Sequence, residues 1–145
     1  MATVTDPFLI SNFRVEIDNI PSATFSQVLG LDLSIDIVDY RTGATVPLAP
    51  EKLPGLARYQ NITLKRGFTQ NLDLWNWVQN ILNGVSDKRN LTIVLQDAQH
   101  NDVIRWSVKN AWPCHWSGPA LIAGSSEVAI ESLEICHEGF ALALG

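Results

Sequence analysis

The feature that most constrains this chain is a two-residue alternation of apolar and polar side chains that changes phase within one segment. From Leu31 to Ile37 the apolar residues occupy the odd positions, but at Val38 and Tyr40 they occupy the even positions. Alternation with this period is typical of a β-strand with one buried face. A one-residue slip sends the side chains to the other face unless a bulge absorbs it. A strand of this kind is therefore suited to leaving one sheet for a second, in its own subunit or in a neighbour.

The same alternation recurs along most of the chain and predicts a mainly β fold. Strands are expected at 13–17, 59–67, 91–95, 104–108 and 128–135. In the last of these, Val128 and Ile130 share one phase while Leu133 and Ile135 share the other, so this strand should also change face. Turns ahead of it are marked at four positions: Pro113, Gly118, Pro119 and Gly124.

One segment has the period of a helix instead. Its apolar residues recur three and four positions apart, at Leu74, Trp77, Val78, Ile81 and Leu82. Thr69 or Asn71 can supply an N-cap, and Gly84 stands where a left-handed C-cap belongs. We therefore predict that residues 1–145 form one domain, an antiparallel β-sandwich or barrel with a single covering helix at 71–83.

Residues 42–57 are expected to form a long connection and not a regular element. Pro47, Pro50 and Pro54 exclude a helix or a central strand, because each lacks a backbone N–H. Connections of this length in compact domains usually have a function. The segment also carries apolar residues, which favours a loop that docks on a surface.

Charge and composition argue against nucleic-acid and membrane functions. The formal net charge is −5 and the basic residues are scattered, so the chain has no basic patch for phosphates. The segment 1–13 lacks the basic and apolar regions of a signal peptide, and no apolar run approaches the ~18 residues of a membrane span. We expect a protein made in the cytoplasm with its two cysteines reduced.

The cysteine and histidine residues do not predict a metal site. Cys114-His115 and Cys136-His137 are adjacent pairs, and neighbours on a strand point to opposite faces, so neither pair can readily present both ligands to one ion. A disulfide between the two cysteines is sterically possible if their strands pair, but a reducing site of synthesis disfavours it. We expect no metal and no cofactor, and assign neither cysteine a role.

The pattern of nucleophiles, bases and acids does not predict an enzyme. His115 and Ser117 with a distant Asp could be imagined as a hydrolase triad, but the GxSxG elbow and the Gly-rich phosphate loops are missing. The acids of the 128–135 strand fit a solvated face better than a pair of catalytic carboxylates. The tryptophans fit core and interface anchors better than a platform for sugars or bases.

Several short motifs occur in an order that resembles a known family. They are FRVEID (13–18), a strand ending in Tyr40-Arg41, KLPGL (52–56), RYQNITLKRG (58–67), LWNWV (74–78), KNAWP (109–113), WSGP (116–119) and SSEVAIESLEICHEG (125–139). Each motif is weak alone, but the ordered set covers nearly the whole chain. In this order and spacing the chain resembles the tail tube proteins of contractile phages and of phage-derived contractile injection systems. Cys114, His115 and Cys136 stand outside the resemblance.

The resemblance implies a non-enzymatic structural protein. Members of this family form hexameric rings whose strands close into one shared β-barrel, and the rings stack into a rigid hollow tube. The implied partners are further copies of the chain, a contractile sheath protein, baseplate or hub and terminator proteins, and a lumen cargo of protein effectors, tape-measure protein or DNA. The implied setting is a phage tail or an extracellular or cytoplasmic injection particle. A barrel closed across subunits also leaves no free sheet edge, which agrees with the expected fold.

Three sets of residues follow as candidate sites. The resemblance assigns ring-to-ring contact to the 42–57 connection, with the candidates Val46, Leu48, Lys52, Leu53, Pro54, Gly55 and Leu56. It places the helix outside, facing the sheath, with the candidates Asn71, Asp73, Asn76, Gln79 and Asn80. As a hypothesis from the alternation, the lumen is lined by Asp32, Ser34, Asp36, Glu131 and Glu134, which would keep acidic cargo from sticking.

Two functions of other classes stay open at this point. A monomeric β-sandwich module could bind carbohydrate or peptide through its tryptophan cluster, and it would remain a monomer at all concentrations. A hydrolase using His115 would lose its activity in the His115→Ala variant. The physical features of the sequence do not distinguish a phage tail tube from an injection-system tube. We favour the injection system, and the identity of the neighbouring genes would separate the two.

Overall fold

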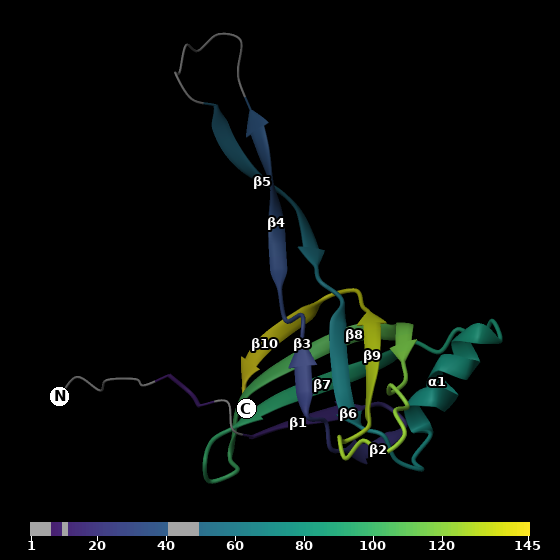
Figure 1. Cartoon of the computed structure of the whole chain (residues 1–145). Coiled ribbons are helices and arrows are strands. Elements are labelled where there is room, and N and C mark those ends of the chain that lie inside the picture. Colours follow the sequence, from purple (N-terminus) through teal and green to yellow (C-terminus); the bar gives the residue numbers. More distant parts are fainter. Residues whose placement is uncertain (1–6, 10–11, 41–49) are drawn as a thin grey trace.

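The computed structural model describes residues 7–9, 12–40 and 50–145, and this part of the chain forms ten strands and one helix (Figure 1). The elements are β1 (Asn12–Ile17), β2 (Ile20–Ala23), β3 (Gln27–Leu29), β4 (Leu33–Tyr40), β5 (Glu51–Tyr59), β6 (Ile62–Gly67), α1 (Asp73–Leu82), β7 (Arg89–Gln96), β8 (Asp102–Ser117), β9 (Ile130–Cys136) and β10 (Phe140–Leu144). The predicted mainly β fold with one helix is confirmed.

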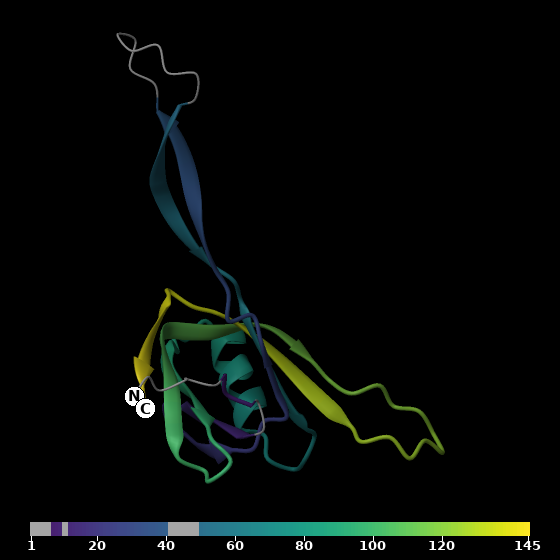
Figure 2. The same cartoon turned by 90° about the vertical axis from the view of Figure 1, so that its left-hand side faces the viewer.

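One antiparallel sheet, folded over on itself, makes up the body of the molecule (Figures 1 and 2). Its strand order is β2-β1-β7-β8-β9-β6-β3, and β10 pairs along the first half of β8. β4 and β5 pair with each other in a separate two-stranded ribbon that projects away from the body. The helix α1 lies against the body beside β8 and β9.

The long strand β8 is the element that folds the sheet over. It pairs with β7 from Asp102 to Ala111, and with β9 from Trp112 to Ser117. Where it passes from one partner to the other, its register with β7 shifts and Asn110 has a φ of +50°. Asn is among the few non-glycine residues that adopt this conformation readily. One strand therefore serves both layers of the body.

Two sequence predictions in this region are wrong. Pro113 does not make a turn, because it lies within β8 opposite Ile135, beside a register shift of the kind at which strand prolines are tolerated. The strand predicted from Val128 begins only at Ile130, and Val128 is 77% exposed ahead of it. The expected change of face of the apolar side chains in that strand is confirmed, because Ile130 lies on the face opposite buried Leu133 and Ile135.

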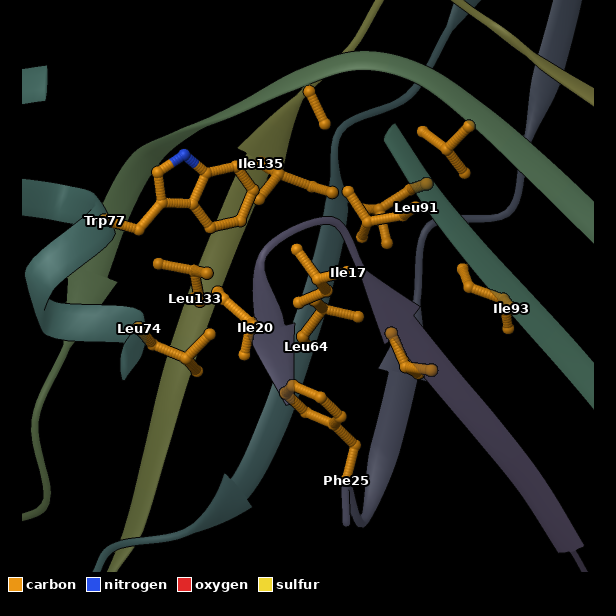
Figure 3. Close-up of a cluster of buried hydrophobic side chains, with 14 residues drawn as sticks. Ile17, Ile20, Phe25, Leu64, Leu74, Trp77, Leu91, Ile93, Leu133 and Ile135 are labelled. Carbon is orange, nitrogen blue, oxygen red and sulfur yellow. The ribbon is translucent and has the colours of Figure 1, made fainter. Parts of the chain in front are cut away.

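The core lies between the two layers and under the helix (Figure 3). Each central strand contributes alternate residues, as its sequence pattern predicts, and α1 contributes Leu74 and Trp77, both fully buried. The strand residues of the core are Val15, Ile17, Ile20, Ile62, Leu64, Leu91, Ile93, Val108, Ala111, Leu133 and Ile135, joined by Phe25.

The helix ends as predicted but begins differently. Gly84 has a φ of +79°, its N–H donates to the Ile81 carbonyl at 3.1 Å, and the Val85 N–H donates to the Asn80 carbonyl at 2.9 Å. This is the Schellman arrangement that a glycine after a helix favours. At the start, the N-cap residue is Leu72 without a side-chain bond. The predicted N-cap role of Asn71 is therefore wrong by one position, although its Oδ1 accepts the Asp73 N–H at 3.0 Å.

A partly buried polar network joins α1 to β7. The Asp87 carboxylate accepts hydrogen bonds from Arg89 at 2.8 and 3.0 Å and from Asn80 Nδ2 at 2.9 Å, and its backbone carbonyl accepts Trp77 Nε1–H at 2.7 Å. Arg89 also lies over the Trp77 ring, 5.1 Å from its centre. The Arg89 hydrogen bonds, helped by Asn80, hold the pKa of the Asp87 carboxyl below its ordinary value, against the effect of burial.

This network predicts a pH-dependent contribution to stability. Because the pKa of Asp87 is lower in the folded chain than in the unfolded one, the contribution is complete above about pH 4 and is lost as the pH falls through the lowered pKa. Asp87→Asn should reduce the free energy of unfolding by about 1 kcal/mol at pH 7, and the difference from the unmodified chain should narrow in acid. Urea unfolding from pH 7 to pH 2 measures this. A difference that stays constant over that range would contradict the assignment.

Candidate functional site

The ribbon of β4 and β5 is the part of the structure that most needs a partner. Its strands are paired from Leu33 with Tyr59 to Tyr40 with Glu51, and the ribbon extends from the top of the body in both views (Figures 1 and 2). Almost all of its side chains are exposed. An isolated two-stranded ribbon is marginally stable in water at best. The ribbon is therefore the candidate site of association.

The apolar side chains of the ribbon change from one face to the other along its length. Near the body they lie on what we call the base face, formed by Leu33, Ile35 and Ile37. Toward the far end they lie on the opposite face, which we call the tip face and which is formed by Val38, Tyr40 and Leu53. All six side chains are between 39% and 67% exposed. A ribbon with this distribution offers apolar surface in two directions.

A bulge on β5 lies beside the change of face but does not remove it. Ile35 pairs with Ala57 and Ile37 with Pro54, so β5 has one residue more than β4 in this interval. The prediction that all of residues 42–57 form a connection is wrong, because 51–57 belong to β5. Pro54 is accommodated because each strand of a two-stranded ribbon is an edge and because the bulge interrupts the ladder here.

Five of the seven residues predicted to make ring-to-ring contacts lie within the described residues, and two do not. Lys52, Leu53, Pro54, Gly55 and Leu56 are all exposed and lie in β5. Val46 and Leu48 lie outside the described residues, so their prediction is untested.

The ribbon leaves the body through a tightly packed junction. Gly30 has a φ of +93°, and a Cβ at this position would lie 2.1 Å from the Asn61 carbonyl oxygen. On the other strand, His137 Nε2 lies 2.8 Å from the Gln60 carbonyl oxygen, while its Nδ1 accepts the Gly139 N–H at 3.1 Å. Because Nδ1 is an acceptor, the His137 proton belongs on Nε2, which donates to Gln60. These contacts hold the direction of the ribbon relative to the body.

The residues proposed to line a lumen do not share one environment. Asp32, Ser34 and Asp36 are on or beside the ribbon, and Asp36 is paired with Arg58 at 2.9 Å. Glu134 lies on the sheet face opposite the core and accepts a hydrogen bond from Asn61 Nδ2 at 3.2 Å.

The prediction that Glu131 lines the lumen is wrong, because this side chain is buried. It is only 4% exposed and forms an ion pair with buried Arg66. Its other oxygen accepts Trp116 Nε1–H at 3.3 Å, and Arg66 donates to the Asn71 carbonyl at 3.0 Å. A carboxylate in this position stabilises the body and cannot face a lumen.

The residues proposed for the outer face of the helix are also not equivalent. Asn76 and Gln79 are exposed, and Asp73 is half-buried in the first turn. The Asn80 side chain is bonded to Asp87, and the Asn71 side chain accepts from the helix N-terminus. Asn71, Asn76 and Gln79 are the exposed members of the set, and of these Asn71 uses its side chain to accept the Asp73 N–H.

The cysteines are not part of a metal site in the described residues, whereas Trp75, Trp112 and Trp116 line one pocket of about 380 Å³ together with Cys114. Cys114 and Cys136 are free thiols, and the described residues contain no group of three His, Cys, Asp or Glu side chains that could hold a metal. Burial, with the neighbouring Cys136 and Glu134, raises the pKa of Cys114 to about 12, so this thiol is a poor nucleophile. Trp77 is in the core, while Trp75 packs edge-on against Trp116 at 5.1 Å.

In one exposed apolar segment, the sequence predicted only turns and the start of a strand at Val128. Residues 118–129 connect β8 to β9 and present Leu121, Ile122 and Val128 to solvent. The sequence feature that marks this segment is the apolar pair Leu121-Ile122 within a stretch rich in Gly, Pro and Ser. That composition alone predicts turns. No helix in the described ranges is long and apolar enough to cross a membrane.

Comparison with known proteins gives a consistent result. The family model of the T4-like virus tail tube protein gp19 matches residues 11–141. A chain in the PVC sheath/tube terminator of an extracellular contractile injection system is 30% identical, with a TM-score of 0.83 over 97% of this chain and 99% of that one. A chain in the anti-feeding prophage tube-terminating cap is 26% identical, with a TM-score of 0.86 over 100% and 96%.

A more distant structure shares the fold alone. Hcp1 from Flavobacterium johnsoniae is 12% identical, with a TM-score of 0.58 over 92% of this chain and 95% of that one. No curated protein sequence matches the chain.

The junction at Gly30 yields a test with a matched control. Gly30→Ala should reduce the free energy of unfolding by more than 2 kcal/mol or so, because the new Cβ meets the Asn61 carbonyl as well as straining the backbone. Gly84→Ala should cost about 1 kcal/mol, since Gly84 has a similar φ of +79° but open space around its Cβ. Urea unfolding of both variants measures the difference, and equal costs would contradict the packed junction.

Proposed function

The chain belongs to the T4-like virus tail tube protein family, and from this premise we propose that it is the protomer of a rigid inner tube, closing in six copies into rings that stack around a hollow lumen. The observation that carries the proposal is the exposed β4–β5 ribbon, whose apolar surface has no cover within the described protomer. The role is structural, not catalytic. A monomeric binding module is not favoured, because it would leave this ribbon in water.

The two apolar faces of the ribbon support contact with more than one neighbouring copy. The base face lies next to the body, where a neighbour in the same ring can reach it, and the tip face lies farther out, where the next ring can reach it. We assign ring closure to the base face and ring stacking to the tip face together with Leu56 at the bulge. Burial of Leu and Ile side chains contributes about 1.5–3 kcal/mol each, which is ample for a contact repeated around a ring.

The outer surface would meet the sheath. α1 covers one side of the body and exposes Asn76 and Gln79, which are uncharged hydrogen-bonding groups. A polar surface of this kind suits a contact that must hold before contraction and release during it. Tube ends would meet baseplate and terminator proteins, and the similarity to a chain in a sheath/tube terminator structure supports this.

The lumen would be lined by the sheet face opposite the core. On β6 this face carries Thr63 and Lys65, and on β9 it carries Ser132 and Glu134. With Asp32 and Asp36 at the ribbon, the face is polar and carries both signs of charge. Such a surface suits passage of protein effectors, a tape-measure protein or DNA without tight binding.

We favour an extracellular injection particle over a phage tail, with assembly in the bacterial cytoplasm. The support is the likeness to chains of the PVC and anti-feeding prophage structures at 26–30% identity. The discriminating observation is the gene neighbourhood. Capsid and DNA-packaging genes would point to a phage, and effector genes to an injection system.

Stacking should depend on Leu53 and Leu56. Leu53→Ser/Leu56→Ser should leave the fold and the rings intact but shorten or abolish tubes, because both side chains lose a dry partner surface. Negative-stain electron microscopy with solution mass across a concentration series measures rings and tubes separately. The control is Leu82→Ser/Val85→Ser, which removes exposed apolar groups from the end of α1. Tubes of normal length from the Leu53/Leu56 variant would count against the assignment.

Lumen acidity is testable by charge reversal. Asp32→Lys/Glu134→Lys should increase retention of an acidic protein cargo several-fold at low salt, and less at high salt, because the attraction is screened. Asn76→Lys/Gln79→Lys adds positive charge on the outer helix and should not change retention. Cargo bound per purified tube is the measured quantity. Retention unchanged in the first variant, or raised equally in both, would refute the lumen assignment.

A further inference from the structure

The 118–129 segment and the β4–β5 ribbon project from opposite sides of the body. In both views the ribbon leaves the top, while the yellow-green segment between β8 and β9 lies on the lower side, and in Figure 2 it extends far from the body. Both are extensions of strands that belong to the same layer, since β5 continues into β6 and β6 pairs with β9. The protomer therefore has an apolar projection at each end.

The 118–129 segment is an ordered turn that presents apolar side chains outward. Leu121 is 91% exposed and Ile122 is 65% exposed. The Ser125 N–H donates to the Ile122 carbonyl at 3.3 Å, and Gly124 supplies the φ of +79° that the turn requires. At its root, Gly118 lies against the Trp116 ring, where an added Cβ would be only 3.1 Å away. These contacts hold the apolar side chains in place without covering them.

Between the two arms of this turn lies a groove with both polar and apolar lining. Its volume is about 370 Å³, far above the ~30 Å³ share of one water molecule. It is lined among others by Pro119, Leu121, Ile122, Val128 and Ile130. Exposed apolar surface of this kind, fixed in shape, marks an interaction site.

We propose that this turn is the acceptor for the tip face of the β4–β5 ribbon of the next copy along the tube, so that each ring-to-ring junction joins a ribbon to a 118–129 turn. The proposal rests on the proposed function. Rings that stack head to tail use two different surfaces, one on each side of the ring, since a heterologous contact repeats by translation. The ribbon occupies one side, and the turn is the apolar feature on the other.

The exposed apolar side chains of the ribbon fit this occupant. The tip face offers Val38, Tyr40 and Leu53, which can pack on the exposed apolar side chains of the turn, while the outer backbone edges of the ribbon are unpaired within the described protomer. The 118–130 segment carries a single charge, Glu127, whereas the end of the ribbon carries exposed Lys52 together with exposed Asp39 and Glu51, so charge does not select the occupant. Lateral neighbours and the sheath are the other possible occupants, and each gives a different result below.

The first experiment changes the turn alone. Leu121→Ser/Ile122→Ser should fold normally, because both side chains are exposed, and should form rings while the fraction of rings in tubes falls at least about tenfold. Tubes of normal length would overturn the proposal and leave the sheath as the occupant of the turn. Monomers without rings would overturn it in favour of a lateral neighbour. If the unmodified chain forms neither rings nor tubes at any concentration, it is the proposed function that fails.

The second experiment mixes two variants. Rings of Leu53→Ser/Leu56→Ser retain an intact turn, and rings of Leu121→Ser/Ile122→Ser retain an intact ribbon. Neither should stack alone, but the mixture should give pairs of rings and no longer stacks, because only one junction can combine an intact ribbon with an intact turn. Mass photometry counts single and paired rings. Absence of pairs in the mixture, or pairs from either variant alone, would refute the junction.

Discussion

The structure depends on a ribbon that cannot be stable by itself. β4 and β5 satisfy each other's backbone along one side and present both outer edges and most side chains to water. In a monomer this arrangement is an aggregation hazard, which natural proteins usually cover, shorten or charge. Here the ribbon is long and carries apolar side chains on alternating faces. Under the proposed function, other copies of the chain would cover the ribbon, and association would complete the fold.

The body is organised to hold that ribbon in a fixed direction. β5 runs into β6 with only Gln60 and Asn61 between them, and Gly30 lets β3 turn into β4 against the Asn61 carbonyl. Beneath this junction, buried Arg66 and Glu131 tie β6 to β9, and Arg66 also holds the segment ahead of α1. Removing one member of such a buried pair typically costs 3–5 kcal/mol. The same strands that form the core thus set the angle at which a neighbour is met.

Local periodicity correctly predicted the strands and the helix that show a clear alternation of apolar and polar residues. It failed at residues whose environment is set by a strand far away in the sequence. The alternation at 13–17, 62–66 and 91–95 and the helical spacing from Leu74 onward appear in the structure as expected. Glu131 resembled a solvent-facing acid because its partner Arg66 is 65 positions away in the sequence. Pro113 and Pro54 resembled strand breakers because the register shifts that accommodate them belong to pairings with β9 and β4.

The same limit applied to the candidate site. The phase change at Val38 signalled a two-faced strand, but the acceptor at Leu121 and Ile122 carries no periodic signal and is recognised only from its position opposite the ribbon. The placement of the ribbon and the turn on opposite sides of the body affects how tightly copies of the chain can bind one another. One ribbon–turn contact burying an apolar side chain or two is worth only about 2–4 kcal/mol, too little to hold two free protomers together against the cost of association. In the proposed tube, six such contacts on a preformed ring would act together, because the entropy of bringing two rings into register is lost once. Stacking should thus follow ring closure, and this order keeps stray protomers from adding to a growing tube.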